Sequence, residues 1–336
     1  MLPATRRAHR GADVPELVER ASGGDPRAVA RLISLVEDAS PALREVMALL
    51  APRTGRAQIV GLTGSPGVGK STSASALVSA YRRRGARVGV LAVDPSSPFS
   101  GGALLGDRVR MQEHATDRGV FIRSMASRGH LGGLSWSTPQ ALRVLDAAGC
   151  DVVLIETVGV GQAEVEIASL ADSTIVLLAP GMGDSIQAAK AGILEIADIF
   201  VVNKADRDGA DTTVRDLRYM ASLGDKRDPD RWRPPIVRTV ASRGEGIDDV
   251  VEALDKHAAW MGATGELPRR RRARAASEVE AIAVTALRER LGDLRGGEIL
   301  QTLADQVVAG TLDPYAAADE LVGEVAELAT SVADGA

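Results

Sequence analysis

The alternation of apolar and polar positions divides the chain into a helical beginning, a middle of short apolar runs and a helical end. Over residues 14–50 apolar side chains recur at helical spacing, as at Val29, Leu32, Ile33 and Val36. From Ala57 onward the short apolar runs alternate with amphipathic stretches, and they lie at 59–62, 88–93, 120–122, 152–155, 174–178, 199–202 and 236–237. Each run is too short for a helix and lacks the alternation of a half-exposed strand, which indicates parallel strands covered on both faces. The middle therefore predicts an α/β fold with a doubly wound, mostly parallel sheet.

The strands stop after Gly265, and the rest of the chain is helical in pattern. Pro268 precedes a basic run of Arg269, Arg270, Arg271, Arg272 and Arg274, which we interpret as a solvated face at a domain junction. Helices are predicted over 277–291, 298–309 and 314–332, the last with Asp313 as its N-cap. We predict an N-terminal helical extension (1–50), a nucleotide-binding domain (51–264) and a C-terminal helical arm (265–336).

Composition excludes several classes of protein. The 336 residues are 45% hydrophobic and 25% charged, as in globular proteins, with only 3% aromatic residues and a net charge of −5. Few stacking side chains and an acidic balance argue against nucleic acid as a partner. No apolar run approaches the ~20 residues of a membrane span, and none near the start resembles a secretory signal. We expect no membrane association and a cytoplasmic location.

Cysteine and histidine usage argues against a metal site built from these residues. Cys150 stands alone, so no internal disulfide forms, and we expect it to be buried filler next to a strand. The histidines, which lack the spacing of metal ligands and receive surface or packing roles, are His9, His114, His130 and His257.

The strongest motif is a phosphate-binding loop, which fits the pattern G-x-x-x-x-G-K-[ST] between an apolar run and a helix. Its residues are Gly64, Ser65, Pro66, Gly67, Val68, Gly69, Lys70 and Ser71. Glycines let backbone N–H groups point inward, and the helix N-terminus favours phosphate. We expect Lys70 to contact the terminal phosphates and the Ser71 hydroxyl to coordinate Mg²⁺. The chain is therefore predicted to have the P-loop NTPase fold.

A second motif, Asn203-Lys204-Ala205-Asp206, follows a buried strand and resembles the N-K-x-D base-recognition motif of GTPases. The Asp206 carboxylate accepts hydrogen bonds from N1–H and the 2-amino group of guanine, whereas adenine offers neither. Asn203 would fix the loop, and Lys204 would lie over the base. Ala241 occupies the position that offers a backbone N–H to the guanine oxygen, although Val240 replaces the serine usual before it. These residues predict GTP and GDP as the bound nucleotides.

The run at 152–155 ends in Glu156 and leads to Gly159, which is a Walker B and switch II arrangement. The Glu156 carboxylate would hold Mg²⁺, and Gly159 could turn its N–H toward the γ-phosphate. Val160 stands where small GTPases have a water-orienting glutamine, and Gln162 comes two residues later. We therefore expect slow intrinsic hydrolysis.

Two further loops carry candidate residues. Asp94 ends a strand and opens a loop rich in proline, serine and glycine, which Asp107 closes. Both acids could reach the metal or the attacking water, but Asp107 could equally cap a helix over 108–116. A third loop follows the run at 174–178 and leads through Gln187 to Lys190, which could pair with a switch acid. We add the neighbours Thr72 and Ser242 to the nucleotide-binding set.

Taken together these motifs resemble the methylmalonyl-CoA mutase-associated GTPases, the MeaB/ArgK group of SIMIBI-class G proteins. The likeness extends to Gly106-Asp107-Arg108, to the helical beginning and to Asp313-Pro314-Tyr315-Ala316-Ala317 near the end. It implies a GTPase chaperone that gates delivery of adenosylcobalamin to a mutase and removal of damaged cofactor. It also implies that Asp94, Asp107 and Glu156 surround Mg²⁺ and nucleotide, that Lys190 belongs to a third switch, and that residues 265–336 form a homodimerisation arm. Docking of a cobalamin adenosyltransferase stays open.

Other functions remain as alternatives. A nickel-insertion GTPase of the same class would carry His-rich or Cys/His clusters, which this chain lacks. An ATP-using kinase linked to transport would prefer ATP to GTP. A structural scaffold with an inert P-loop would tolerate Lys70→Ala.

Overall fold

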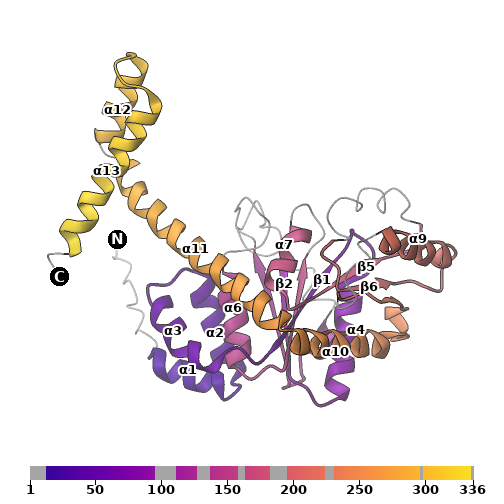
Figure 1. Cartoon of the computed structure of the whole chain (residues 1–336). Helices are drawn as coiled ribbons and strands as arrows, with labels where there is room; N and C mark the ends of the chain where they lie inside the picture. Colours follow the sequence, from indigo (N-terminus) through magenta and orange to yellow (C-terminus); the bar gives the residue numbers. More distant parts are fainter. Residues whose placement is uncertain are drawn as a thin grey trace, which may run out of the picture. The chain divides into compact units, whose positions relative to one another are not determined.

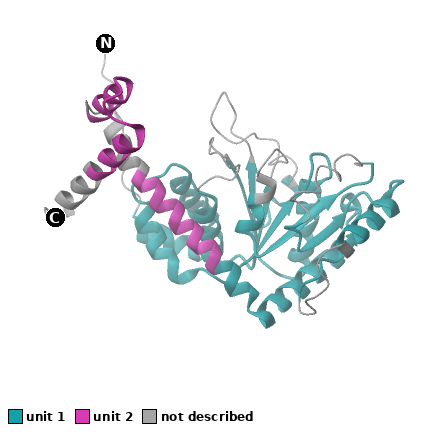
Figure 2. Cartoon of the chain, turned by 45° about the horizontal axis from the view of Figure 1, so that its top comes forward, with its two compact units in different colours: residues 1–271 teal, residues 272–336 magenta. Residues whose placement is uncertain are grey.

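The computed structural model describes residues 13–94, 111–126, 137–157, 163–181, 195–223, 231–295 and 298–333. The chain forms two compact units, residues 1–271 and residues 272–336 (Figure 2). Of Asp94 the structure describes the backbone alone.

The first unit is built on a parallel sheet with strand order β3-β2-β4-β1-β5-β6-β7. Its strands are β1 (Gln58–Thr63), β2 (Val88–Asp94), β3 (Val120–Ala126), β4 (Val152–Thr157), β5 (Ser173–Leu178), β6 (Ile199–Val202) and β7 (Ile236–Arg238). Every pairing between these strands is parallel. The P-loop strand β1 lies at the centre, between β4 and β5. The prediction of a doubly wound parallel sheet is confirmed.

Helices cover both faces of this sheet (Figure 1). They are α4 (Lys70–Arg83), α6 (Thr138–Ala147), α7 (Ala163–Leu170), α9 (Ala210–Leu223) and α10 (Ile247–Thr264). Alternate residues of each strand point to opposite faces, so Val60 and Leu62 pack with α4 and α10 whereas Ile59 packs with α6 and α7. This two-sided burial explains why the strands are apolar without alternation.

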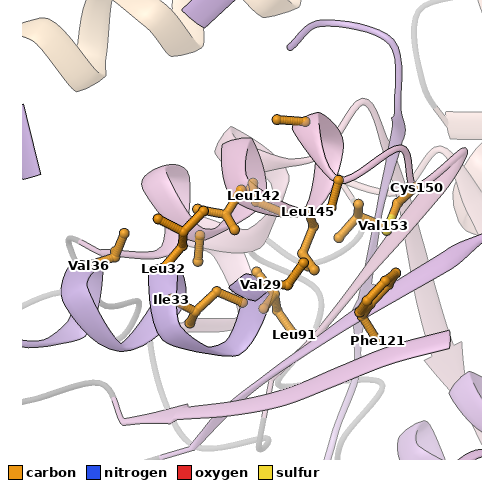
Figure 3. Packing of buried hydrophobic residues seen from close by; sticks show 14 of the residues in the cluster. Val29, Leu32, Ile33, Val36, Leu91, Phe121, Leu142, Leu145, Cys150 and Val153 are labelled. Carbon is orange, nitrogen blue, oxygen red and sulfur yellow. The ribbon is translucent and has the colours of Figure 1, made fainter. Parts of the chain in front are cut away.

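The N-terminal helices share a core with the sheet. They are α1 (Val14–Ser22), α2 (Pro26–Glu37) and α3 (Leu43–Leu50), and a 3₁₀ turn at Ala51–Arg53 leads from them to β1. Asp13 and Asp25 cap α1 and α2, and proline follows at the second position of α1 (Pro15) and at the first position of α2 (Pro26). Val29, Leu32 and Ile33 of α2 face Leu142 and Leu145 of α6 (Figure 3). The extension therefore belongs to the same compact unit as the sheet.

Cys150 lies in the same core, beside the start of β4 (Figure 3). It is buried, as predicted, and burial raises the pKa of its thiol to about 12.

The helices after α10 differ from the prediction in one respect. They are α11 (Glu266–Arg295), α12 (Glu298–Val308) and α13 (Pro314–Ala333). Asp313 caps α13 as expected, accepting from Tyr315 N at 2.8 Å. The predicted start of α11 at residue 277 is wrong: α10 ends at Thr264, Gly265 follows as its C-cap with φ 75°, and α11 begins at Glu266. Pro268 falls in the first turn, where a missing N–H costs no helical hydrogen bond.

The arginine run therefore lies inside a helix, and its interpretation as a solvated face is wrong for two members. The side chains of Arg270 and Arg271 are only 28% and 27% exposed and form ion pairs with Asp198 and Asp172. Among the described residues, no helix is both long and apolar enough to cross a membrane.

Candidate functional site: a nucleotide pocket at the carboxyl edge of the sheet

The P-loop connects β1 to α4 at the carboxyl edge of the sheet. Gly69 caps α4 in the left-handed region with φ 97°, and Gly64 has φ 141°. A Cβ on Gly64 would lie 2.3 Å from the carbonyl oxygen of Leu177, so only glycine fits there. Lys70 is buried, and its Nζ donates to the carbonyl oxygens of Gly64 at 2.6 Å and Ser65 at 3.3 Å. The lysine thus lies along the inside of the loop, where phosphates bind in this fold.

The hydroxyl of Ser71 donates a hydrogen bond to Oε1 of Glu156. Both residues are buried, and the parallel register of β1 and β4 pairs Leu62 with Glu156, which places the end of β4 beside the P-loop. Asp94 is the last residue of β2, the other neighbour of β4, so its backbone lies at the same edge. The structure thus brings together the elements that carry Ser71, Asp94 and Glu156.

Several candidates lie outside the described residues. They are Asp107, Gly159, Val160, Gln162, Gln187 and Lys190. Where a helix over 108–116 was expected, the described residues from Met111 onward form a 3₁₀ turn at Gln112–His114. That turn is held to α4: the Ser75 hydroxyl donates to Glu113 and lies 3.0 Å from Nε2 of the buried His114.

Asn203 joins three loops of the pocket. Its Nδ2 donates to the carbonyl oxygen of Val68 at 2.8 Å, and its Oδ1 accepts from Thr239 Oγ1 at 3.1 Å and from the backbone N–H of Ala241 at 3.0 Å. The side chain is buried, and a Cβ on Gly69 would lie 2.5 Å from its Nδ2. The N–H of Ala241 that we assigned to guanine is thus donated to Asn203. A guanine oxygen bound there would share the Ala241 N–H with Asn203 Oδ1.

Lys204 and Asp206 complete the base loop. Lys204 has φ 57°, and its Nζ donates to the carbonyl oxygen of Gly67 at 2.6 Å, so its stem lies across the space between the two loops. The Asp206 carboxylate is exposed, as a group that receives a base must be. Arg243 Nη2 lies 3.6 Å from Asp206 Oδ2, and Arg243 Nε is 2.9 Å from Glu245 Oε1. Thr72, which follows Ser71 in α4, and Ser242, which follows Ala241, are both exposed.

The arrangement can bind a nucleotide at both of its ends, with phosphates on the P-loop and a base at Asp206. Sequence reasoning missed the contacts between residues of the site. These are the hydrogen bonds of Asn203 with Val68 and Thr239, and the position of Arg243 beside Asp206. Thr239 and Arg243 flank the Ala241 that was chosen, so a search two residues to either side would have included both.

Comparison with known proteins decides the family. The model of the family described as "Methylmalonyl Co-A mutase-associated GTPase MeaB" matches residues 29–294. This chain belongs to the MeaB family. The match includes both the P-loop and the base loop, and the family is one of GTPases, so GTP hydrolysis is the activity of this chain.

Relatives agree over most of the chain. A protein of Pyrococcus abyssi named as a GTPase is 48% identical over 314 residues, which cover 93% of this chain and 97% of that protein. GTPase ArgK of Escherichia coli is 38% identical, over 76% of this chain and 79% of that protein. The mouse methylmalonic aciduria type A homolog, mitochondrial, is also 38% identical, over 74% of this chain and 64% of that protein.

A solved structure has the same fold as this MeaB-family chain. It is the crystal structure of a LAO/AO transport system kinase, which is 30% identical in sequence with a TM-score of 0.67, and the match covers 95% of this chain and 99% of that one.

Proposed function

We propose that this MeaB-family GTPase is a chaperone that gates adenosylcobalamin delivery to methylmalonyl-CoA mutase, or a related mutase, and protects that enzyme. The observation that carries the proposal is the family match over residues 29–294, in a chain whose P-loop and base loop are joined by Asn203. The name of the mouse relative, which refers to methylmalonic aciduria, supports the same metabolic setting.

Mg²⁺ is the cofactor that the phosphate end of the pocket fits. Ser71 offers a hydroxyl and Glu156 a carboxylate in contact with it, and we place Asp94 in the same set because it ends β2, the strand next to β4. Hard oxygen donors of this kind suit Mg²⁺, which keeps several waters and binds phosphate oxygens as well. When bound, Mg²⁺ neutralises charge on the phosphate oxygens, while Lys70 and the N-terminus of α4 bind the same anion.

Asp206 gives the pocket its preference for guanine. Its carboxylate accepts from guanine N1–H and the 2-amino group, whereas adenine would turn a lone pair at N1 toward it. We further propose that hydrolysis is slow until a partner completes the site, because Val160 replaces the water-orienting glutamine of small GTPases. The nucleotide would then act as a timer for the partner.

We also propose that the C-terminal helices form a homodimer. In the described part of residues 272–336, apolar side chains are exposed, as at Val279 (66%), Ile282 (49%) and Leu287 (52%) of α11. Exposed apolar surface of this kind marks association. Light scattering of the full chain should give a dimer, and Ile282→Glu with Leu287→Glu should give a monomer. A wild-type monomer at micromolar concentration would contradict the dimer and leave the chaperone role untouched.

The mutase role is tested by measuring GTP hydrolysis with and without an adenosylcobalamin-dependent methylmalonyl-CoA mutase. We expect a complex on size-exclusion chromatography and faster hydrolysis within it. A cobalamin adenosyltransferase added to the complex tests whether a third protein docks. An unchanged rate together with no complex would refute the mutase role, whereas the GTPase assignment would stand on the rate of the chain alone.

A further inference from the structure

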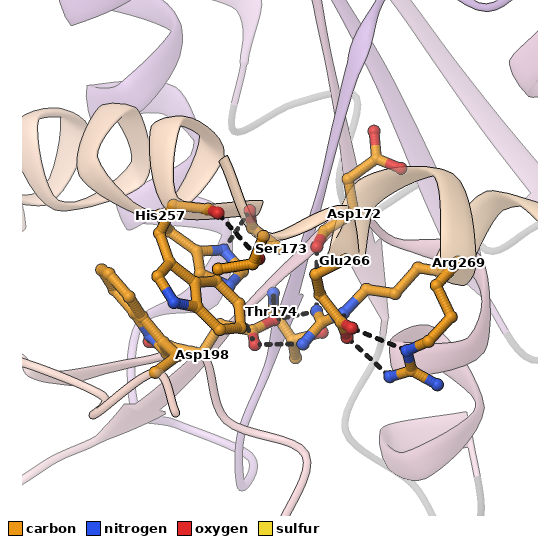
Figure 4. A network of polar contacts seen from close by, with 11 residues as sticks. Asp172, Ser173, Thr174, Asp198, His257, Glu266 and Arg269 are labelled. Carbon is orange, nitrogen blue, oxygen red and sulfur yellow. Dashed lines mark hydrogen bonds and ion pairs between the residues drawn. The ribbon is translucent and has the colours of Figure 1, made fainter. Parts of the chain in front are cut away.

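A network of charged and polar side chains lies at the opposite edge of the sheet from the nucleotide pocket (Figure 4). We call it the amino-edge network, because Asp172 and Asp198 immediately precede β5 and β6. It consists of Asp172, Ser173, Asp198, His257, Glu266, Arg270 and Arg271. Every member belongs to the first compact unit, and the last three lie in the first turns of α11.

Arg270 and Arg271 each hold one aspartate with two guanidinium nitrogens, Nη1 and Nη2 in Arg270 and Nε and Nη2 in Arg271. Arg270 donates to Asp198 Oδ2 at 2.8 Å and Oδ1 at 2.9 Å, and also to the carbonyl oxygen of Asp172 at 3.0 Å. Arg271 donates to Asp172 Oδ2 at 2.8 Å and Oδ1 at 3.2 Å, and also to the carbonyl oxygen of Ala57 at 2.9 Å. Paired donors of this geometry fix orientation as well as charge.

The aspartates are in turn fixed to the strands. Asp172 is 1% exposed, and its Oδ2 accepts from the backbone N–H of Ile59 in β1 at 3.1 Å. Asp198 is 7% exposed, and its Oδ2 accepts from the backbone N–H of Thr174 in β5 at 2.8 Å. Buried carboxylates are strongly destabilised when a partner is removed, so strand positions and arginine positions are set together.

The strands that carry this network also carry the nucleotide loops at their other ends. β1 runs from the network to Gly64 of the P-loop, and β6, about 13 Å long at ~3.3 Å per residue, runs from Asp198 to Asn203. α7 lies between Glu156 and Asp172 in the chain, and it packs tightly on β1: a Cβ on Gly61 would lie 2.8 Å from Ile167. Each nucleotide loop is thereby connected through a strand to a carboxylate of the network.

The order of contacts in a hydrolase triad is also found in this network, at Ser173, His257 and Asp198. Unlike the serine of a hydrolase, however, Ser173 is not accessible to a substrate. Ser173 Oγ is 2.8 Å from His257 Nδ1, and His257 Nε2 is 3.3 Å from Asp198 Oδ1. Ser173 and His257 have no exposed surface, and Arg270 already neutralises Asp198. No substrate reaches this serine, so the set is a packing and charge arrangement.

We propose that the amino-edge network is a coupling joint through which the nucleotide state of the pocket is passed to the first turns of α11, the helix that continues into the C-terminal unit. The inference rests on nucleotide binding by this GTPase and is independent of the mutase. Asp172 is bonded to β1 and Asp198 directly precedes β6, so the two carboxylates move with these strands. Arg270 and Arg271 bind the carboxylates, so residues 266–271 move with them. By linkage, the joint also acts in reverse on nucleotide affinity.

Hydrogen exchange of the full chain with GDP, with a non-hydrolysable GTP analogue and without nucleotide tests the proposal. Binding of both nucleotides is first measured by fluorescence, so that failure to bind is separated from failure to couple. We expect exchange at residues 266–275 to differ between the GDP and GTP-analogue forms. Normal binding of both nucleotides with identical exchange in this segment would overturn the proposal, and this comparison needs no variant.

Variants then assign the effect to the arginines. In Arg271→Lys, which keeps the charge but loses the fork, we expect the nucleotide-dependent difference in exchange to shrink and the ratio of GDP to GTP-analogue affinity to change about fivefold. Arg272→Lys is the matched control, because Arg272 is exposed in the same run. A purely structural clamp would lower the melting temperature of Arg271→Lys and leave the affinity ratio and the exchange difference as in the control, which would refute coupling.

Discussion

The side-chain amide of Asn203 donates to the carbonyl oxygen of Val68 at 2.8 Å, which ties the base loop directly to the phosphate loop. The same side chain accepts from Thr239 and Ala241, so a single buried residue aligns the parts of the pocket that meet opposite ends of a nucleotide. A substitution at Asn203 should therefore weaken binding of the whole nucleotide. It should not by itself change which base is preferred.

Asn203→Ala should weaken GDP binding about 10- to 100-fold, because it leaves buried groups of Val68 and Ala241 without their partner at about 1–3 kcal/mol. Titration of a fluorescent GDP measures the loss. Asp208→Ala, an exposed residue in the same loop, is the control and should bind as wild type does. Equal affinity of the two variants would contradict the role given to Asn203.

Ser71→Ala should raise the Mg²⁺ concentration needed for half-maximal GTP hydrolysis by about tenfold or more, because a hydroxyl ligand beside Glu156 is lost. Ser73→Ala is matched to it in helix, burial and chemistry, and should leave the Mg²⁺ dependence unchanged. If both variants respond to Mg²⁺ as wild type does, Ser71 is not a metal ligand.

Arg243→Gln should speed GDP association at low ionic strength, because the guanidinium competes with the base for Asp206. Both side chains are largely exposed, so the effect should stay below about fivefold and vanish near 1 M salt, where the Debye length is ~3 Å. Stopped-flow association rates at several salt concentrations check this. Slower association in the variant would mean that Arg243 assists the base.

His257 should make stability depend on pH. Burial lowers the pKa of its imidazole below 6.5, although Asp198 opposes the shift. The unfolded chain therefore binds a proton at a pH where the folded chain does not, so the free energy of unfolding should decrease as pH falls below about 6.5, by at most ~1.4 kcal/mol per unit. Urea unfolding followed by tryptophan fluorescence measures this, because Trp260 stacks on the His257 ring and Trp232 lies tilted against it. His257→Gln should flatten the dependence between pH 6.5 and 5, and an equal slope in both proteins would contradict it.

Patterns along the chain were enough to predict the sheet, because its strands are short apolar runs buried on both faces. They were also enough to predict the P-loop and the base loop, whose chemistry needs a fixed order of adjacent residues. They failed where the cause lies far away in sequence. Arg270 and Arg271 looked solvated because their partners, Asp198 and Asp172, precede strands encoded about 70 to 100 residues earlier. The start of α11 was placed at residue 277 because the arginine run was interpreted as a solvated junction, whereas the helix begins at Glu266 and its first turn accepts Pro268.

The central claim, that Asp206 makes this pocket a guanine-nucleotide site, is tested most directly by displacing a bound fluorescent GDP with GTP, ATP and XTP. We predict displacement by GTP at far lower concentration than by ATP. In Asp206→Asn, which exchanges a carboxylate for an amide, the preference for GTP should fall about 5- to 150-fold, for a loss of about 1–3 kcal/mol, and XTP should gain. The control Asp208→Asn should keep the wild-type order. Displacement by ATP as effective as by GTP in the wild-type chain would contradict the account and favour an ATP-using kinase.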